Sequence, residues 1–392
     1  MKRGPQGDCS TSSAPLRGVL PPWTPASSTR GQVSSALVDH AARRRRLASR
    51  LDELQAGAFL VTRPPNVRYL TGFTGSNGQL ILTSTDGIFL TDSRYIEQAR
   101  HEVPDLRREM YSAEFASRTS QACMELGADR IAFEAAGVSY KLYSDLLATG
   151  IDLVPTTDAI EQMRRIKEPD ELRAVEAAQA IADQAFEAIV GKLSEGVTER
   201  EIALDLDSTM RRLGGDALAF DTILAFGESA AEPHHSPSDR SLTRGDVVKL
   251  DFGCVIDGYH SDMTRTVFFG EPLAELRDVY EIVRAAQQLG VDNARPGMSG
   301  DELDGVVRNV ITEAGYGDKF GHGLGHGVGL EIHEAPWLRS GGKDILEPGT
   351  VVTVEPGIYL EGVGGIRIED MVALTAEGCR ELPSTTKELL VL

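Results

Sequence analysis

One stretch near the C-terminus, FGHGLGHGVGLEIHEAP (320–336), concentrates side chains that can do chemistry. It carries His322, His326 and His333, three of the eight histidines in the chain. Imidazole is both a common metal ligand and a proton carrier near neutral pH. Alternating glycines predict an extended segment whose backbone is approached closely by another group, such as a substrate. In a regular strand His333 would face away from His326, so the chain must bend between Val328 and His333 if both serve one site.

Two carboxylates come together in a predicted hairpin. In VVKLDFGCVIDGYHSDMTRTVFF, the dipeptide Asp257-Gly258 is a strong signal for a two-residue turn. The resulting register pairs Asp262 with Gly253 and makes Asp251 a diagonal neighbour of Asp262 on the same face. Flanked by apolar residues, the two carboxylates either share a proton, bind a cation or face solvent.

A faint internal repeat runs through the second half of the chain. GVTEREIALDLDSTMRRLGG (196–215) is similar to GMSGDELDGVVRNVITEAGYG (297–317), and each opens with a Ser/Thr-x-x-Glu capping box that begins a helix. Each segment follows another predicted long helix, over 169–190 and 272–290. This order of elements predicts a pseudo-symmetric α+β domain.

The same repeat predicts a second pair of carboxylates. DVVKLDFG (246–253) is similar to TVVTVEPG (350–357), which puts Glu355 in the place of Asp251, and a later strand brings Glu369. Burying four such charges without cations would be very costly. Two divalent ions would balance them, and oxygen-rich ligation favours Mn²⁺, Co²⁺ or Fe²⁺, with Zn²⁺ as a further candidate. Two such ions acidify a shared water and hold a carbonyl for attack.

Four segments together resemble the pita-bread metallopeptidases, above all the branch of Xaa-Pro aminopeptidase and prolidase (Xaa-Pro dipeptidase). They are LDFG…SDMTRT, GHGLGHGVGLEIHEAP, VTVEPGIYL and GGIRIED. Upstream, NVRYLTGFTGSNG (66–78) and LTDSRYIEQA (90–99) resemble the creatinase-type N-terminal domain. The resemblance covers about 38 to 392. It implies a curved antiparallel sheet covered by helices in the catalytic domain, preceded by a smaller α/β domain.

The resemblance implies a metal role for five residues. The ligands of two divalent ions, Mn²⁺ first among them, would be Asp251, Asp262, His326, Glu355 and Glu369. Asp262 and Glu369 would bridge the ions, and Glu355 would also relay protons.

Other matched residues would act on the substrate. His333 corresponds to the family histidine near the scissile carbonyl, His322 to one in the substrate pocket, and Arg367 to an arginine beside the bridging glutamate. The segment SAAEPHHSPSDR resembles a family loop whose first histidine assists catalysis, and that histidine corresponds to His234. The segment carries His235 where the family usually has glycine, so His235 is a second candidate that contacts substrate.

The implied reaction is hydrolysis of the bond between an N-terminal residue and a following proline, with a metal-bridging hydroxide as nucleophile. A methionine aminopeptidase-like enzyme shares the five ligands but usually lacks the creatinase-like domain. A non-catalytic pita-bread module that binds peptides typically loses ligands, and none is lost here. A dipeptidase must also bind the proline carboxylate, for which Arg339 is the candidate; the alternative is a surface-loop arginine.

Composition narrows the class of protein and of partner. The 392 residues carry a net charge of −19, which argues against nucleic acid as a partner. No apolar stretch of about 18 residues exists, which argues against a membrane protein. Cys9, Cys123, Cys254 and Cys379 form no CxxC pair and fit a reducing cytoplasm. The expected partners are proline-containing peptides and, from the family, a second copy in a homodimer.

Three regions are expected along the chain. Residues 1–36 read as a disordered leader, with a transit peptide or a misassigned start as alternatives. Residues 37–158 form the creatinase-like N-terminal domain and 159–392 the pita-bread catalytic domain. The segment DHAARRRRLASRLDEL (39–54) predicts the first helix, with Arg43–Arg46 on a solvated face.

Overall fold

The computed structural model describes residues 38–112 and 114–392, together with Met1. The predicted leader lies outside the described residues apart from Met1. The residues from Val38 to Leu392 cluster as one unit, so the expected boundary near 158 stays a prediction. Among the helices of the described chain, none offers an apolar stretch of the length that crossing a bilayer requires.

A mixed sheet with the strand order β4-β3-β2-β1-β5-β6 organises the N-terminal region. Its strands are β1 (Ala58–Val61), β2 (Gly78–Leu82), β3 (Gly87–Thr91), β4 (Arg107–Met110), β5 (Arg130–Glu134) and β6 (Asp152–Thr156). The helices around it are α1 (His40–Ala48), α2 (Pro64–Thr71), α3 (Ile96–Glu102), α4 (Phe115–Glu125), α5 (Tyr140–Leu147) and α6 (Glu161–Arg164). The short apolar runs of β1 and β3 are buried along their whole length, as expected for strands covered on both faces. This confirms the predicted small α/β domain.

The first helix differs from the prediction in length and in its arginines. It ends at Ala48, and the following residues form turns. The prediction that the whole arginine run faces solvent is wrong, because Arg43 and Arg44 are buried. Arg43 pairs with Glu168, which caps the N-terminus of helix α7 (Pro169–Val190), and Arg44 pairs with Asp105. Carboxylates distant in the sequence thus supply the partners that make burial of these charges tolerable.

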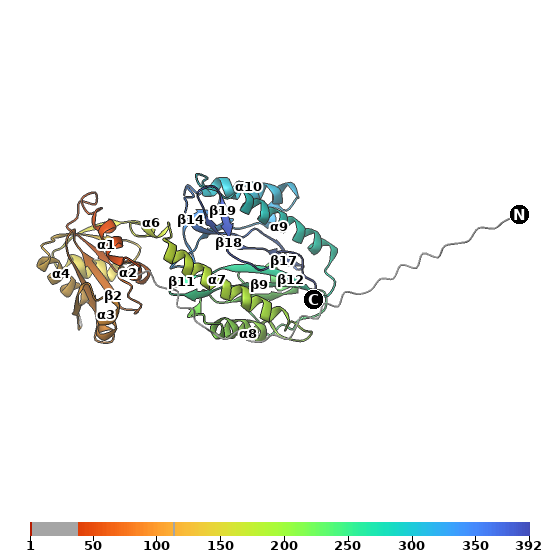
Figure 1. Cartoon of the computed structure of the whole chain (residues 1–392), viewed down its shortest axis with the longest axis horizontal. Coiled ribbons are helices and arrows are strands. Elements are labelled where there is room, and N and C mark those ends of the chain that lie inside the picture. Colours follow the sequence, from red (N-terminus) through yellow and green to blue (C-terminus); the bar gives the residue numbers. More distant parts are fainter. Residues whose placement is uncertain (2–37, 113) are drawn as a thin grey trace. The chain divides into compact units, whose positions relative to one another are not determined.

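Two helix pairs frame the C-terminal region (Figure 1). They are α7 (Pro169–Val190) with α8 (Glu199–Arg212), and α9 (Ala274–Asn293) with α10 (Gly300–Glu313), and the members of each pair pack together. Both predicted capping boxes are formed, by Thr198 with Glu201 and by Ser299 with Glu302. The predicted repeat is therefore present at the level of helices and their caps.

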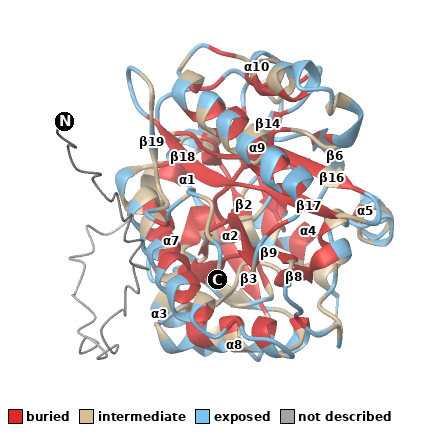
Figure 2. Ribbon diagram, turned by 90° about the vertical axis from the view of Figure 1, so that its right-hand side faces the viewer, coloured by how far each residue is buried: buried red, intermediate tan, exposed pale blue. Residues whose placement is uncertain are grey.

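The strands of this region form several small antiparallel sheets, which Figure 2 shows as largely buried beneath helices whose outer faces are exposed. The sheet orders are β12-β9-β8, β14-β13-β15-β18-β19, β11-β10-β7 and β16-β17. The strands are β7 (Ala217–Leu218), β8 (Ile223–Phe226), β9 (Asp246–Phe252), β10 (Cys254–Ile256), β11 (Tyr259–His260), β12 (Met263–Phe269), β13 (Gly325–Gly327), β14 (Glu334–Leu338), β15 (Val351–Val354), β16 (Gly357–Leu360), β17 (Gly364–Arg367), β18 (Asp370–Leu374) and β19 (Cys379–Glu381). Two short 3₁₀ turns, η1 (Gly227–Ala231) and η2 (Gly317–Lys319), connect them.

The first carboxylate hairpin has the predicted register. Asp257 and Gly258 occupy the turn with φ angles of 48° and 80°, the left-handed backbone that a type I′ turn requires. Strand β9 then pairs with β12 so that Thr264 lies opposite Asp251. The second hairpin repeats this geometry: Val354 pairs with Asp370 and Gly357 with Arg367, which brings the positions of Glu355 and Glu369 opposite each other.

The glycine-rich segment is not the regular strand that its alternation predicts. Only Gly325–Gly327 is a strand, and its register shifts after His326. At Gly325 and Gly327 the neighbouring backbone leaves no room for a side chain: a Cβ atom on Gly325 would lie 2.1 Å from the carbonyl oxygen of Thr353, and one on Gly327 would lie 2.4 Å from that of Ala335. Such contacts are far inside van der Waals distance, so β13 fits between its two neighbouring strands only when these two positions are glycine.

Adding one methyl group at Gly325 should therefore destabilise the fold. We expect Gly325→Ala to lower the free energy of unfolding by about 1–3 kcal/mol, measured by urea denaturation, because backbone must shift to admit the Cβ atom. Gly321→Ala is the matched control, since nothing lies within 4 Å of its added Cβ, and it should change stability by less than about 0.5 kcal/mol. Equal stability of the two variants would contradict this account.

Candidate metal centre and active site

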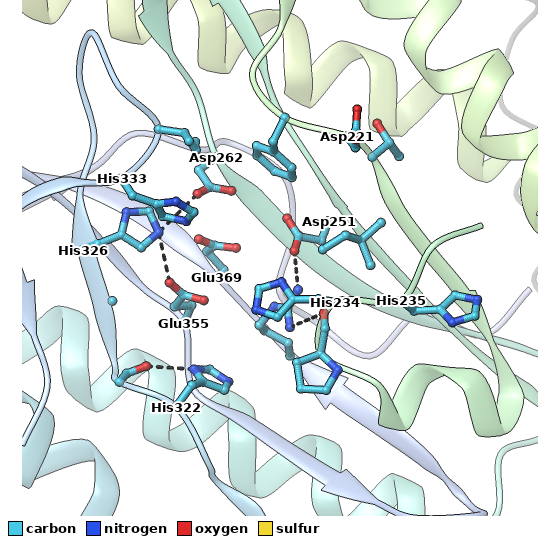
Figure 3. Close-up of a pocket in the computed structure, with 18 of the residues that line it drawn as sticks. Asp221, His234, His235, Asp251, Asp262, His322, His326, His333, Glu355 and Glu369 are labelled. Carbon is cyan, nitrogen blue, oxygen red and sulfur yellow. Dashed lines mark hydrogen bonds and ion pairs between the residues drawn. The ribbon is translucent and has the colours of Figure 1, made fainter. Parts of the chain in front are cut away.

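A cavity of about 630 Å³ collects the residues that the sequence singled out. Figure 3 shows the four predicted carboxylates around it, with His326 and His333 on one side and His234 and His322 on others. Asp251 comes from β9, Asp262 from just before β12, Glu355 from just after β15, and Glu369 from just before β18. The cavity is also bordered by His235, Arg339 and Arg367, and by apolar side chains including Phe220, Ile332 and Trp337.

Three of the carboxylates lie in surroundings that disfavour their charge. Burial, together with the nearby Glu369 and Asp251, raises the pKa of Asp262 well above its usual range. Burial and the charge of Glu355 do the same to the pKa of Glu369. For Glu355, burial raises the pKa to about 7, although Arg367 opposes the shift. Like charges packed this closely call for protons or for a cation.

Asp251 is held by a buried arginine. The guanidinium of Arg367 pairs with the Asp251 carboxylate, donates 3.0 Å to the Thr264 hydroxyl and 2.8 Å to the Tyr359 hydroxyl, and reaches the Pro233 carbonyl at 3.3 Å. Arg367 therefore orients the metal-site carboxylates and offsets one negative charge, and its own donors are already engaged.

His326 is the histidine that faces the carboxylates. Its Nδ1 lies 3.0 Å from the carbonyl oxygen of its neighbour Gly327, which places the proton there and leaves the Nε2 lone pair free. That Nε2 is 3.4 Å from Glu355 and 3.6 Å from Asp262. Burial, followed by the nearby His333, lowers the pKa of His326 to about 4, so the ring is neutral and suited to bind a metal.

The bend required between Val328 and His333 is present. The chain leaves the strand after Gly327 and turns through the residues up to His333. This brings the rings of His326 and His333 into an edge-to-face contact with centroids 4.4 Å apart. His333 is exposed to the cavity, where it can meet a bound molecule.

His322 and Tyr359 form a separate polar contact in the cavity wall. The Nε2 atom of His322 is 2.9 Å from the Tyr359 hydroxyl, and its Nδ1 atom is 2.8 Å from the carbonyl of Gly323. Burial lowers the pKa of His322 to about 4. The ring is therefore neutral, and it lines the cavity.

The two adjacent histidines before β9 point in different directions. In Figure 3 His234 faces the cavity and His235 points away from it. Both ring nitrogens of His235 contact carboxylates outside the cluster, those of Glu232 and Glu199. Arg339, the candidate for carboxylate recognition, is exposed at the cavity edge, with its guanidinium 5.5 Å from the ring centroid of Trp337.

Two threonines that sequence reasoning missed support the carboxylates. The Thr264 hydroxyl donates 2.6 Å to Glu369, and the Thr353 hydroxyl donates 3.0 Å to Glu355. Each lies two residues from a predicted ligand, at the spacing that puts side chains on one face of a strand. That signal was available in the sequence. The phenol of Tyr359 had no comparable signal, because its partners meet it only in the fold.

The donor set fits divalent metal ions. Asp262, His326 and Glu369 each offer a ligand atom within 4.8 Å of the other two, and all three are buried. Among the described residues, oxygen Oε1 of Glu369 has no hydrogen-bond partner although it is buried, which fits an oxygen that binds a cation. Glu355 adjoins this group through His326, and Asp251 adjoins it through Arg367. Mainly carboxylate ligands with one imidazole suit Mn²⁺, Fe²⁺, Co²⁺ or Zn²⁺.

Comparison with known proteins agrees with this site. Residues 173–376 match metallopeptidase family M24, and residues 43–166 match the creatinase/prolidase N-terminal domain. The chain belongs to metallopeptidase family M24. The matched residues 173–376 include all five predicted ligands. Membership of a metallopeptidase family implies that this enzyme binds divalent metal.

Relatives of this M24 metallopeptidase extend over nearly the whole described chain. A solved structure of the Xaa-Pro dipeptidase from Bacillus anthracis is 39% identical, with a TM-score of 0.88 over 90% of this chain and 100% of that one. The X-Pro aminopeptidase from Thermotoga maritima is 37% identical, with a TM-score of 0.83 over 89% of this chain and 100% of that one. A Xaa-Pro dipeptidase of Pyrococcus horikoshii is 36% identical over 87% of this chain and 96% of its own length. These structures confirm the predicted fold class.

Metal binding should depend on Glu369. We expect Glu369→Gln to lose most of the bound divalent ion and the rise in melting temperature that the ion causes, because a buried anionic ligand becomes neutral. Elemental analysis and thermal denaturation with and without Mn²⁺ measure both effects. Glu361→Gln, which removes the same charge at an exposed turn, is the control and should bind metal like the wild type. Full metal content in Glu369→Gln would refute the assignment.

The chelated protein should lose stability as pH rises. Asp262, Glu355 and Glu369 have raised pKa values in the metal-free fold. Each therefore holds its proton more tightly folded than unfolded, and its contribution to stability disappears as pH rises through the folded-state pKa, near 7 for Glu355. Urea denaturation of EDTA-treated protein between about pH 6.5 and 9 should show this decline, because the opposing contribution of His322 and His326, whose pKa values are lowered to about 4, is complete above the ordinary histidine pKa. Metal-saturated protein should not show it, since bound cations replace the protons.

Proposed function

We propose that this M24 metallopeptidase hydrolyses the bond between an N-terminal residue and a following proline, as an Xaa-Pro aminopeptidase or Xaa-Pro dipeptidase. The observation that carries the proposal is that the five proposed ligand side chains border one cavity, which also exposes His234 and His333. The activities by which the dipeptidase and aminopeptidase relatives are named support the same substrate class. Proline-containing peptides are the expected partners.

Two divalent ions are the proposed cofactor, with Mn²⁺ preferred over Co²⁺, Fe²⁺ and Zn²⁺. Asp251, Asp262, His326, Glu355 and Glu369 would hold them. When bound, the ions lower the pKa of water and polarise the substrate carbonyl. The Thr264 and Thr353 hydroxyls and the Gly327 carbonyl fix the orientation of the ligands before any ion arrives.

Protein side chains supply the proton transfers and the binding of the carbonyl. Glu355 accepts a proton from the attacking water at a carboxylate oxygen and delivers it to the proline nitrogen, which must be protonated to leave. His333 and His234 donate hydrogen bonds toward the oxygen of the scissile carbonyl as negative charge develops on it. His322, fixed by Tyr359, lines the side of the cavity that receives the peptide.

The scissile bond itself explains why a dedicated pocket is needed. The proline nitrogen bears no hydrogen, so an enzyme cannot grip this amide through its N–H group. Recognition must rely on the shape of the pyrrolidine ring and on the chain termini. Apolar side chains such as Phe220, Ile332 and Trp337 border the cavity and would contact the ring.

Peptide cleavage tests the proposed reaction. Mn²⁺-loaded protein should release alanine from Ala-Pro or from Ala-Pro-Ala and should leave Ala-Ala largely intact. Comparing the first two substrates separates a dipeptidase from an aminopeptidase. Failure to cleave either one after metal loading would sink the proposal, and cleavage of Met-Ala peptides alone would support a methionine aminopeptidase-like enzyme instead.

Arg339 is the proposed partner of the proline carboxylate in a dipeptide. We expect Arg339→Ala to raise KM for Ala-Pro about tenfold with little change in kcat, because a charge-assisted hydrogen bond made throughout the reaction is lost. Lys343→Ala removes an exposed positive charge from the same loop and serves as the control. An unchanged KM in Arg339→Ala would remove this role. A cytoplasmic location and a homodimer stay predictions.

A further inference from the structure

The segment that carries His234 into the cavity is tied down by its neighbour. Figure 3 shows His234 and His235 projecting to different sides of the segment between η1 and β9. The Nδ1 atom of His235 lies 2.8 Å from Oε2 of Glu232, and its Nε2 atom lies 2.9 Å from Oε2 of Glu199. One imidazole ring therefore bridges two carboxylates immediately beside a residue of the proposed active site.

Glu199 is the fixed end of this bridge. It is the first residue of α8 and is fully buried, with 0% of its surface exposed. Its Oε1 accepts from the backbone N–H of Phe226 at 2.8 Å, while its Oε2 accepts from the backbone N–H of Ser238 at 2.9 Å and from the Ser238 hydroxyl at 2.6 Å. Burial opposes ionisation, but the hydrogen bonds from Ser238, His235 and Phe226 outweigh it and lower the pKa of Glu199. The carboxylate is thus anionic and cannot readily turn away.

The backbone around His234 is held from the other side as well. The side-chain nitrogen of buried Lys249 donates to the carbonyl oxygens of Ala230 at 3.0 Å and Glu232 at 2.5 Å. Burial lowers the pKa of Lys249 to about 7, and the neutral amine can still donate these hydrogen bonds. Arg367 reaches the carbonyl oxygen of Pro233. These contacts fix the backbone before His234. On the side that follows it, the His235 bridge adds to the two hydrogen bonds that Ser238 donates to Glu199.

The bridge depends on the protonation of one ring. Only an imidazolium donates from both nitrogens, while a neutral ring presents a lone pair to one of the two carboxylates. The groups facing the ring are anionic, Glu232 from its own segment and Glu199 from α8. The nearby cation Arg240 is already paired with Asp246. Burial opposes the charge on His235, but the hydrogen bonds to the two carboxylates raise its pKa above the ordinary value.

We propose that His235 is a positioning residue, whose protonated ring clamps the loop 232–238 to Glu199 and so holds His234 toward the scissile carbonyl. The clamp is complete at pH values below the ordinary range of histidine titration. It weakens as pH rises through the folded-state pKa of His235, when one of its two hydrogen bonds is lost. Its effect on turnover rests on the proposed function of His234, whereas its effect on the orientation of His234 does not.

Two variants and a control separate the clamp from a general structural role. His235→Ala removes the bridge. Glu232→Gln keeps the ring but replaces an exposed anion with an amide, which can donate to a neutral imidazole, so the bridge no longer needs a proton. His101→Gln changes an exposed histidine on α3 that also contacts a glutamate, and it should behave like the wild type throughout.

The kinetic measurement is the ratio of kcat of the wild type to kcat of His235→Ala, followed as a function of pH. With Mn²⁺ and Ala-Pro or Ala-Pro-Ala, kcat of the wild type should exceed that of His235→Ala about tenfold at pH 6, since misplacing a reacting group by a fraction of an ångström costs rates of this order. The ratio of the two kcat values should become smaller as the pH rises to 9, because the neutral ring keeps only one of its two hydrogen bonds. Glu232→Gln should retain activity at pH 9 relative to pH 6 better than the wild type. A ratio that is constant across pH would overturn the clamp.

Histidine ring NMR of the Zn²⁺-loaded, diamagnetic protein tests the clamp without turnover. The His235 ring should titrate above the ordinary histidine value of 6.5, and Glu232→Gln should lower that titration point. The His234 signals should shift or broaden together with the loss of the His235 proton, and at every pH in His235→Ala. If His235 titrates at or below the ordinary value, or if the His234 signals do not change with it, the inference is wrong even in an active enzyme. If peptides are not cleaved but these NMR changes occur, the proposed function fails and the clamp stands.

Discussion

Repulsion among buried carboxylates is the constraint around which this structure is organised. Asp251, Asp262, Glu355 and Glu369 converge from strands distant in the sequence, and burial raises the pKa of three of them. A fold gains nothing from such a cluster by itself, because unpaired buried charge is costly. Bound cations would neutralise this repulsion. Repulsion among the carboxylates therefore both destabilises the metal-free fold and favours the binding of metal ions.

The scaffold answers this constraint with two hairpins of matching register. In each hairpin, the regular pairing of the two strands is interrupted at a carboxylate and resumes beyond it. Asp262 lies at the interruption in the first hairpin, and Glu355 and Glu369 lie at that in the second. Strand pairing fixes the backbone to within small displacements, and the hydroxyls of Thr264 and Thr353 then orient the carboxylates. Ligands mounted on strands in this way keep their geometry while repelling one another, which a loop would not achieve.

The histidines around the site differ because their surroundings differ. His326 is buried beside a backbone carbonyl and is held neutral, with a lone pair directed at the carboxylates. His322 is also neutral but is engaged by a phenol. His235 lies between two anions and favours the opposite charge state. The same side chain can thus serve as a ligand, a wall residue or an ionic clamp, according to which partners the fold provides.

Local sequence was sufficient to predict the first carboxylate hairpin and both capping boxes, because turn chemistry and helix capping act over a few residues. The second pair of carboxylates came from the internal repeat, and the assignment of five metal ligands came from the resemblance to a family. The Asp257-Gly258 turn sets its register without help from the rest of the chain. Resemblance to a family then distinguished His326 from its neighbours. Long-range packing settled the remainder: the burial of Arg43 against Glu168, the close approach of Thr353 to Gly325, and the turning of His235 toward Glu199, 36 residues away. These contacts join residues far apart in the chain, and no periodicity or spacing encodes which partners will meet.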